Sequence, residues 1–272
     1  MTLYSISSAA NRQPQQPRRP ARIFVSAASV LLSLLAGCRA PQHVQLTVSV
    51  AASLTGTIEP LENAFQKQHP EVEFRNNFGS SGVLARQIEQ GAPVDLFLSA
   101  ASKPVDELIA KGMIAAGQSR VLLSNRLVLI TPTNSSLASI AQLNTAQVRR
   151  VAIGDPQSVP AGQYALQSLQ SAKLAEAIRG KLVFAKDVRQ VLAYVETGDA
   201  DAGFVYATDA ASSPRVRVAA QVPDAAHDPI LYPMAVIQQS SHATEAREFC
   251  DFLAAPEAAA VFTAKGFTVA AH

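Results

Sequence analysis

The fold is decided by residues 46–68, which read LTVSVAASLTGTIEPLENAFQKQ. The opening LTVSV is rich in β-forming residues, and a loop of small residues, AASLT, follows it. Beyond this loop, Ile58, Leu61 and Phe65 lie at helical spacing and predict a helix over residues 54–68. The stretch therefore predicts a strand, a loop of small residues and a helix, which is the repeating unit of α/β proteins.

The same alternation continues along the chain. Further strands are predicted at 72–74, 94–99, 127–130, 150–153, 181–184, 202–206, 215–219 and 234–237, and further helices at 83–90, 105–111, 161–172, 188–197, 243–253 and 258–265. Near-continuous apolar strands such as residues 127–130 are typical of parallel sheets that helices cover on both faces. We therefore predict an α/β fold of two lobes with parallel-dominated sheets.

The chain is expected to pass twice between the lobes, near residues 124–127 and 229–233. Lobe 1 is then predicted to comprise residues 45–124 and 233–272, and lobe 2 residues 125–232. A composition of 48% hydrophobic and 16% charged residues indicates a globular chain that can bury a sizeable core.

The N-terminal segment has the order of an export signal. Three arginines between residues 18 and 22 precede an apolar run over residues 23–35. The sequence Leu-Ala-Gly-Cys at residues 35–38 resembles the lipobox of bacterial lipoproteins, in which the cysteine carries a diacylglyceryl group. This resemblance implies a signal peptide over residues 1–37, a lipid on Cys38 and a tether over 38–44, and so a lipid-anchored protein. An ordinary signal that is cut nearby, with Cys38 incidental, is the alternative.

Removal of this segment changes the expected partners of the protein. The segment holds four arginines and no acid, so the formal net charge falls from +2 to −2. A mildly acidic chain lacks the basic surface that nucleic-acid binding requires. Only Cys250 remains besides Cys38, so no internal disulfide framework is expected if Cys38 is acylated. Cys250 itself is predicted to be a buried apolar side chain.

Motifs of enzymes are missing from the sequence. There is no nucleophile elbow, phosphate-binding Walker loop or dinucleotide fingerprint, and no histidine lies three or four residues from another. This pattern gives no support to a metal centre and indicates that the chain is not an enzyme. A hydrolase or transferase with Ser81 or Cys250 as its nucleophile is a remote alternative, because no histidine partner is recognisable.

Small-residue loops recur where predicted strands pass into helices. These loops lie at residues 51–55, 79–82, 159–162 and 185–189. The first turn of a helix has N–H groups without intrahelical partners and carries roughly +0.5 charge, so several such ends that converge can bind an anion. Ser53 and Ser81 could add hydroxyl donors, although each serine could instead only cap its own helix.

In order and spacing, these loops resemble those of the periplasmic molybdate-binding proteins of ABC importers, over residues 45–269. The motifs that carry the resemblance lie at residues 51–55, 84–89 with 91–97, 154–156 with 159–162, 187–189, 205–206 with Asp209, and 266–268. The resemblance implies a type II periplasmic binding protein fold, with two α/β lobes that a two-strand hinge joins and the ligand between them.

The resemblance also implies the ligand-binding residues, with no lysine or arginine among them. Ser53 and Ser81 would each supply a hydroxyl and an amide, Ala161 and Val188 an amide, and Tyr206 its hydroxyl. Molybdenum would enter only as part of the bound oxyanion, with no cofactor. This chain has Gly82 where the family pattern has serine, which leaves Ser80 as an alternative donor to Ser81.

The function that the resemblance implies is high-affinity binding of molybdate, and of tungstate, at the periplasmic face, by a monomer that delivers the anion to an ABC permease. A receptor for another tetrahedral oxyanion such as sulfate, and a sensor domain without transport, remain alternatives. We expect Arg86 and Arg189 to face solvent or the other lobe, and Asp187 to cap a helix.

Overall fold

The computed structural model describes residues 43–270, and the predicted signal segment, Cys38 and most of the predicted tether lie outside them. The first unit has strand β1 (Val44–Ala51), the short 3-10 helix η1 (Ala52–Leu54) and helix α1 (Ile58–Gln66). Helix α1 begins four residues later than predicted because Gly56 adopts φ +76, a conformation that interrupts a helix and favours glycine.

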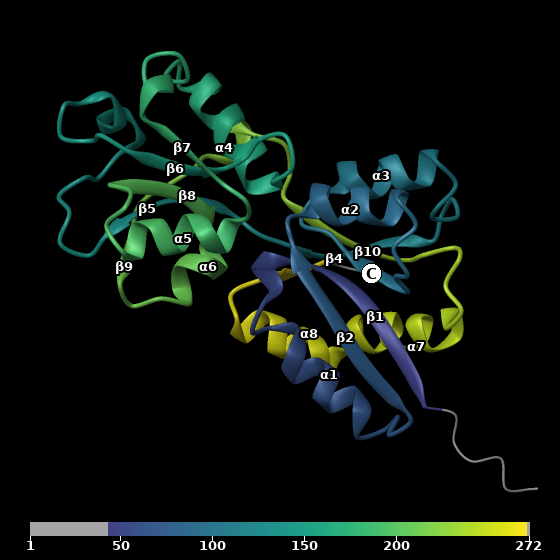
Figure 1. Ribbon diagram of the computed structural model, residues 1–272. Coiled ribbons are helices and arrows are strands. Elements are labelled where there is room, and N and C mark those ends of the chain that lie inside the picture. The colour runs from purple at the N-terminus through teal and green to yellow at the C-terminus, as the bar shows by residue number, and fades with distance from the viewer. Residues whose placement is uncertain (1–42, 271–272) are drawn as a thin grey trace, which may run out of the picture. The chain divides into compact units, whose positions relative to one another are not determined.

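The predicted elements follow along the chain (Figure 1), together with strands at residues 119–124 and 268–269 and a helix at 207–211 that the sequence did not predict. The strands are β2 (Val72–Gly79), β3 (Leu96–Leu98), β4 (Ser119–Ser124), β5 (Leu127–Pro132), β6 (Val151–Gly154), β7 (Leu182–Ala185), β8 (Ala202–Tyr206), β9 (Val216–Gln221), β10 (Leu231–Val236) and β11 (Thr268–Val269). The helices are α2 (Ser81–Glu89), α3 (Ser102–Ala110), α4 (Pro160–Ser171), α5 (Val188–Glu196), α6 (Ala207–Ala211), α7 (Ala243–Leu253) and α8 (Pro256–Ala264). Short 3-10 helices are η2 (Ile140–Asn144), η3 (Arg179–Lys181) and η4 (Asp224–Ala226).

Within the described residues the strands form a six-stranded sheet, β11-β4-β10-β3-β1-β2, and a five-stranded sheet, β7-β6-β8-β5-β9. The two-lobe α/β fold is as predicted, and in each sheet most strands run in one direction, with β5, β10 and β11 opposed to it. Strand β10 is antiparallel to β3 and β4, and β5 is antiparallel to β8 and β9. Both sheets are mixed because the strands that directly follow the two crossings, β5 and β10, run against the strands of the βα units.

Each lobe is built around one of the two sheets. Lobe 1 carries the six-stranded sheet and lobe 2 carries the five-stranded sheet. Only Asn125 and Arg126 separate β4 of lobe 1 from β5 of lobe 2, and the return path runs from β9 to β10. Leu231 and Tyr232 pair with β4 in lobe 1, so the return occurs slightly before the predicted boundary at residue 232.

Helices cover both faces of the lobe 1 sheet. In β3, Phe97 packs with Leu84 and Leu108 of α2 and α3, whereas its neighbours Leu96 and Leu98 belong to the core on the opposite face. This alternation follows from the two-residue period of a strand. Each fully buried side chain of this size stabilises the fold by about 1.5–3 kcal/mol relative to exposure. The rigid sheet thereby fixes the loops at its carboxyl edge.

Candidate functional site

The structure brings all five predicted ligand-binding residues to one small cavity between the lobes. The lining residues are Ala51, Ala52, Ser53, Gly79, Ser80, Ser81 and Ala100 from lobe 1, and Val159, Pro160, Ala161, Asp187, Val188 and Tyr206 from lobe 2. The cavity measures about 10 Å³, which is near the room that one water needs.

Buried backbone N–H groups without partners surround this cavity. Ser53, Ser81, Ala161 and Val188 are only 5%, 1%, 1% and 4% exposed. Their N–H groups donate to no backbone or side-chain acceptor in residues 43–270. Because buried N–H groups are nearly always paired in folded proteins, four such groups around one cavity indicate a ligand that accepts hydrogen bonds.

Three of these groups belong to helix ends. Helices α2, α4 and α5 begin at Ser81, Pro160 and Val188, next to the cavity. Their dipoles add positive potential at the same point, which favours an anion. Pro160 at the start of α4 lacks an N–H, so Ala161 offers the first amide of that helix.

The hydroxyl groups of the cavity are arranged by neighbouring residues. Ser81 Oγ accepts a hydrogen bond of 2.9 Å from the N–H of Ala100, which leaves the Ser81 hydrogen free to donate. Ser53 Oγ lies 2.9 Å from Tyr232 Oη. Ser80 Oγ is buried and hydrogen-bonds to nothing in the described residues. Both Ser80 and Ser81 therefore have a hydroxyl hydrogen available at the cavity.

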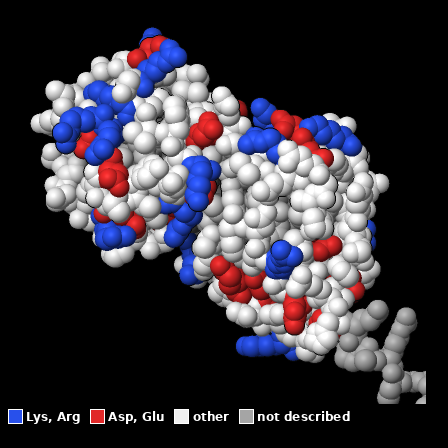
Figure 2. All heavy atoms as spheres, in the orientation of Figure 1, with Lys and Arg blue, Asp and Glu red and all other residues white. Residues whose placement is uncertain are grey.

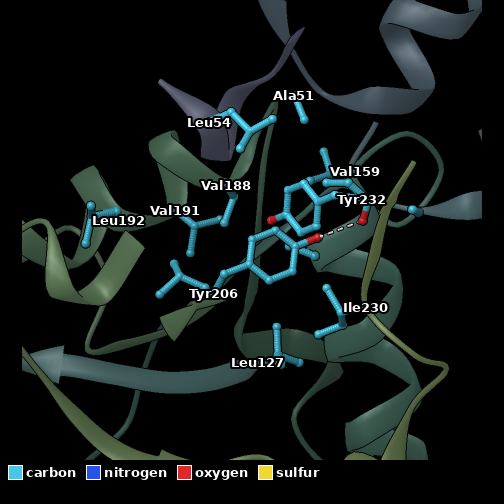
Figure 3. Packing of buried hydrophobic residues seen from close by; sticks show 14 of the residues in the cluster. Ala51, Leu54, Leu127, Val159, Val188, Val191, Leu192, Tyr206, Ile230 and Tyr232 are labelled. Atoms are coloured by element: carbon cyan, nitrogen blue, oxygen red, sulfur yellow. Dashed lines mark hydrogen bonds between the residues drawn. The ribbon is translucent and has the colours of Figure 1, made fainter. Parts of the chain in front are cut away.

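Tyr206 reaches the cavity from the end of β8 in lobe 2. Its hydroxyl donates a long hydrogen bond of 3.5 Å to the Ala100 carbonyl of lobe 1. Burial raises the pKa of Tyr206 well above 10, so the phenol stays protonated and remains a donor. Figure 3 shows its ring beside that of Tyr232 among apolar side chains, with a centroid separation of 5.8 Å.

Charged side chains near the site are engaged elsewhere. No lysine or arginine is among the residues that line the cavity. Asp187 caps α5 as predicted, since its carboxylate accepts a bond of 2.8 Å from the N–H of Gln190. Arg189 donates to Asp209 at 3.3 Å and to Ser212 at 2.9 Å, both in lobe 2. The hydrogen bonds of this arginine therefore stay within its own lobe.

The carboxyl group of Asp209 in α6 is fully buried. Burial raises its pKa to about 7, and the nearby Arg189 guanidinium opposes that rise. On the face shown in Figure 2, acidic and basic side chains are interspersed over both lobes, without a continuous basic area. The positive potential for an anion therefore comes from amides and helix ends.

A backbone hydrogen bond joins the lobes beside the cavity. The N–H of Gly82 donates to the Ser158 carbonyl across 3.0 Å. A Cβ atom at Gly82 would lie 2.7 Å from that carbonyl oxygen, closer than real Cβ contacts. Glycine therefore replaces the serine of the family pattern at a point where the lobes touch.

Sequence reasoning missed several residues of the site. Ala100, Tyr232, Asn125 and Ser158 were not singled out, because their contacts with the loops come from distant parts of the chain. Gly82 was noticed only as a departure from a pattern. A tyrosine beside proline at residues 232–233 offered no signal that distinguishes it from a core residue.

Other features of the described residues do not compete with this cavity. A larger groove of about 630 Å³ lies near the start of β1, but its Asp95 carboxylate is bonded to Ser240 at 2.6 Å and to the Thr47 N–H at 2.8 Å. No cluster of three metal-ligating side chains occurs within residues 43–270. No helix in that range has the length and apolarity to cross a membrane.

A profile described as bacterial extracellular solute-binding protein matches residues 46–268. The chain belongs to this family. Molybdate-binding protein ModA of Escherichia coli (strain K12) is 38% identical over 258 residues, which are 93% of this chain and 99% of that protein. A Bacillus subtilis (strain 168) protein, provisionally named an ABC transporter substrate-binding lipoprotein, is 41% identical over 253 residues, 90% of this chain and 97% of its own.

Solved structures agree with this membership. The periplasmic molybdate-binding protein of Azotobacter vinelandii superposes with a TM-score of 0.74 at 26% identity, over 83% of this chain and 100% of that one. The match confirms the predicted periplasmic binding protein fold for this solute-binding protein.

Family membership also confirms that the chain is a binding protein and not an enzyme. The hydrolase alternative fails on chemistry as well. No histidine lines the cavity at Ser81. Burial raises the pKa of the Cys250 thiol to about 12, which opposes formation of the nucleophilic thiolate.

Proposed function

We propose that this solute-binding protein binds molybdate, and tungstate, between its lobes and delivers the anion to an ABC permease. The observation that carries the proposal is the convergence of the unpaired N–H groups of Ser53, Ser81, Ala161 and Val188 on a cavity without lysine or arginine. The hydroxyls of Ser53, Ser81 and Tyr206 complete the donor set. Relatives that are named molybdate-binding proteins support the choice of anion.

Selection would follow from the chemistry of the donors. Fixed neutral donors can replace the hydration shell of a tetrahedral dianion without a countercharge, and closure of the lobes then excludes water. Amide N–H groups can only donate, Ser81 Oγ already accepts from the Ala100 N–H, and the Asp187 carboxylate accepts from the Gln190 N–H, so few acceptors remain for a ligand proton. Hydrogen phosphate, which keeps a proton, should therefore bind much more weakly than molybdate.

Calorimetric titration of a fragment of residues 42–272, whose described part is compact, tests the proposal. We expect saturable binding of molybdate and tungstate at one site per chain and weak binding of phosphate. Absence of molybdate binding, or comparable affinity for phosphate, would contradict the proposal.

Sulfate is the second candidate because the cavity is small, about 10 Å³ as the lobes stand here. The same donors suit both anions, so only the fit of the closed lobes separates them. Sulfate affinity above that of molybdate in the same titration would favour this alternative.

We further propose that the protein acts as a monomer at the periplasmic face, with a lipid on Cys38. The lipobox-like sequence and a relative named as a lipoprotein support the anchor. Metabolic labelling with a fatty acid should mark the full chain and not a Cys38→Ser variant. Equal labelling of the two would exclude Cys38 as the lipid site.

A further inference from the structure

A chain of hydrogen bonds runs from the connection between the lobes to the cavity. The side-chain amide nitrogen Nδ2 of Asn125 lies 3.4 Å from Tyr232 Oη, and Tyr232 Oη lies 2.9 Å from Ser53 Oγ. Asn125 belongs to the short connection between β4 and β5, and Tyr232 lies in β10 where the chain returns to lobe 1. Along the sequence, Tyr232 lies 107 positions from Asn125 and 179 positions from Ser53.

The orientation of the Asn125 amide is fixed by its other partners. Its carbonyl oxygen Oδ1 accepts from the N–H of Arg126 at 2.9 Å. Its Nδ2 group donates to Thr208 Oγ1 at 2.9 Å. An amide nitrogen can only donate, so Tyr232 must accept at its own oxygen.

The direction of the next bond then follows. Tyr232 has one hydroxyl hydrogen, and Ser53 Oγ is the acceptor within reach in the described residues. The ring is 2% exposed and packs against Tyr206 and Phe267, which holds the hydroxyl in place. Burial raises the pKa of Tyr232 well above 10, so this donor is present at any physiological pH.

We propose that Tyr232, oriented by Asn125, is a positioning residue that makes Ser53 a dedicated hydroxyl donor to the bound oxyanion. Because Ser53 Oγ accepts from Tyr232, its own hydrogen is turned away from Tyr232 and toward the cavity that it lines. Ser81 Oγ is oriented in the same sense by the N–H of Ala100. The inference rests on the proposed function, since it concerns the same anion.

The first experiment compares two tyrosine-to-phenylalanine variants of the full chain by molybdate titration. Tyr232→Phe keeps the ring and removes the hydroxyl, and we expect about a tenfold loss of affinity because Ser53 is no longer oriented. Tyr164→Phe is the matched control: this buried tyrosine lies outside the cavity and its hydroxyl makes only a 3.5 Å bond to the Pro229 carbonyl. We expect the control to change affinity by less than about twofold.

The second experiment separates positioning from general stability by a double-mutant cycle. If Tyr232 acts through Ser53, Tyr232→Phe should cause no further loss of affinity in a Ser53→Ala background. Asn125→Ala should likewise add nothing in a Tyr232→Phe background. The thermal midpoint of each apo variant, measured alongside, shows that folding is retained.

The outcomes are distinct. Fully additive losses in the cycle, or equal effects of Tyr232→Phe and Tyr164→Phe, would overturn the positioning role while molybdate binding by the wild type still stands. A wild type that binds no molybdate would instead remove the proposed function itself.

Discussion

The N–H of Gly82 in lobe 1 donates to the Ser158 carbonyl in lobe 2 across 3.0 Å, and no side chain could fit between them. Gly82 has no positive φ, so its backbone does not require glycine. The requirement comes from the approach of the lobes alone. Gly82 directly follows Ser81, whose amide is a proposed donor to the ligand. The contact between the lobes and the ligand contact therefore involve adjacent residues.

Gly82→Ala should therefore impair closure without harming the fold. The added Cβ would lie 2.7 Å from the Ser158 oxygen, which forces the lobes apart. We expect about a tenfold loss of molybdate affinity by calorimetry. The apo thermal midpoint should be unchanged or slightly higher, since alanine is the better helix former in α2.

Gly180→Ala serves as the control for this substitution. Nothing lies within 4 Å of a Cβ built at Gly180, and its φ is not positive. We expect it to leave affinity unchanged. A Gly82→Ala variant that binds as tightly as Gly180→Ala would show that the lobes need not meet at this point.

Ser81→Ala should weaken binding at the ligand itself. The substitution removes a hydroxyl that faces the cavity and leaves the buried Ala100 N–H without its acceptor. We expect a loss of about 1.5 to 3 kcal/mol in binding free energy, the range for a hydrogen bond to a charged group. Ser168→Ala is a suitable comparison, because that buried serine bonds only within α4, to the Tyr164 carbonyl at 2.7 Å. Equal affinity of the two variants would exclude Ser81 from the donor set.

The loops of the site could be predicted because their signals are local. A strand, a few small residues and a helix start lie within ten residues in each case, and the helix start alone determines which N–H groups are free. The loops at Ser53, Ser81, Ala161 and Val188 all met this condition. The spacing of apolar residues over a short stretch of sequence is therefore enough to predict such a strand-loop-helix unit.

Contacts between distant segments could not be predicted in this way. Tyr232 orients Ser53 from 179 residues away, and Ser158 meets Gly82 only when two lobes come together. Strand β4 was also missed, because among its residues only Leu122 and Leu123 are buried. Apolar runs indicate that strands are covered on both faces but not the direction of each strand, so the reversed strands β5, β10 and β11 could not be predicted.

Glu62 should make the protein less stable as pH rises. It is buried in α1, where burial raises its pKa from 4.5 to about 7, although a 2.8 Å bond from Asn76 Nδ2 opposes that rise. A raised acid pKa favours the protonated folded state, so this contribution is complete below pH 4.5 and is lost as pH rises through about 7.

Glu62→Gln should remove this dependence, because glutamine keeps an acceptor for Asn76 and carries no charge. We expect the variant to be about 2–3 kcal/mol more stable than wild type at pH 8, with little difference at pH 4, in urea unfolding. Glu107→Gln, at an exposed position of α3, should show neither effect. A parallel pH profile for wild type and Glu62→Gln would show that Glu62 is ionised without penalty in the fold.

Arg189→Met tests whether this arginine serves the fold or the anion. The guanidinium lies 3.3 Å from the buried Asp209 carboxylate, whose pKa burial raises to about 7 against the opposing effect of Arg189. Without the arginine that pKa should rise further, so the folded state loses stability as pH increases through 7 and above. We expect the free energy of unfolding to fall by about 2 kcal/mol at pH 8 and by less at pH 5. The effect is modest because Arg189 is partly exposed and solvent screens its charge.

Molybdate affinity of Arg189→Met at pH 6 should stay within about threefold of wild type, since the proposed donors to the anion are neutral. A loss of a hundredfold or more in a folded variant would instead place Arg189 at the ligand and contradict a site without cations.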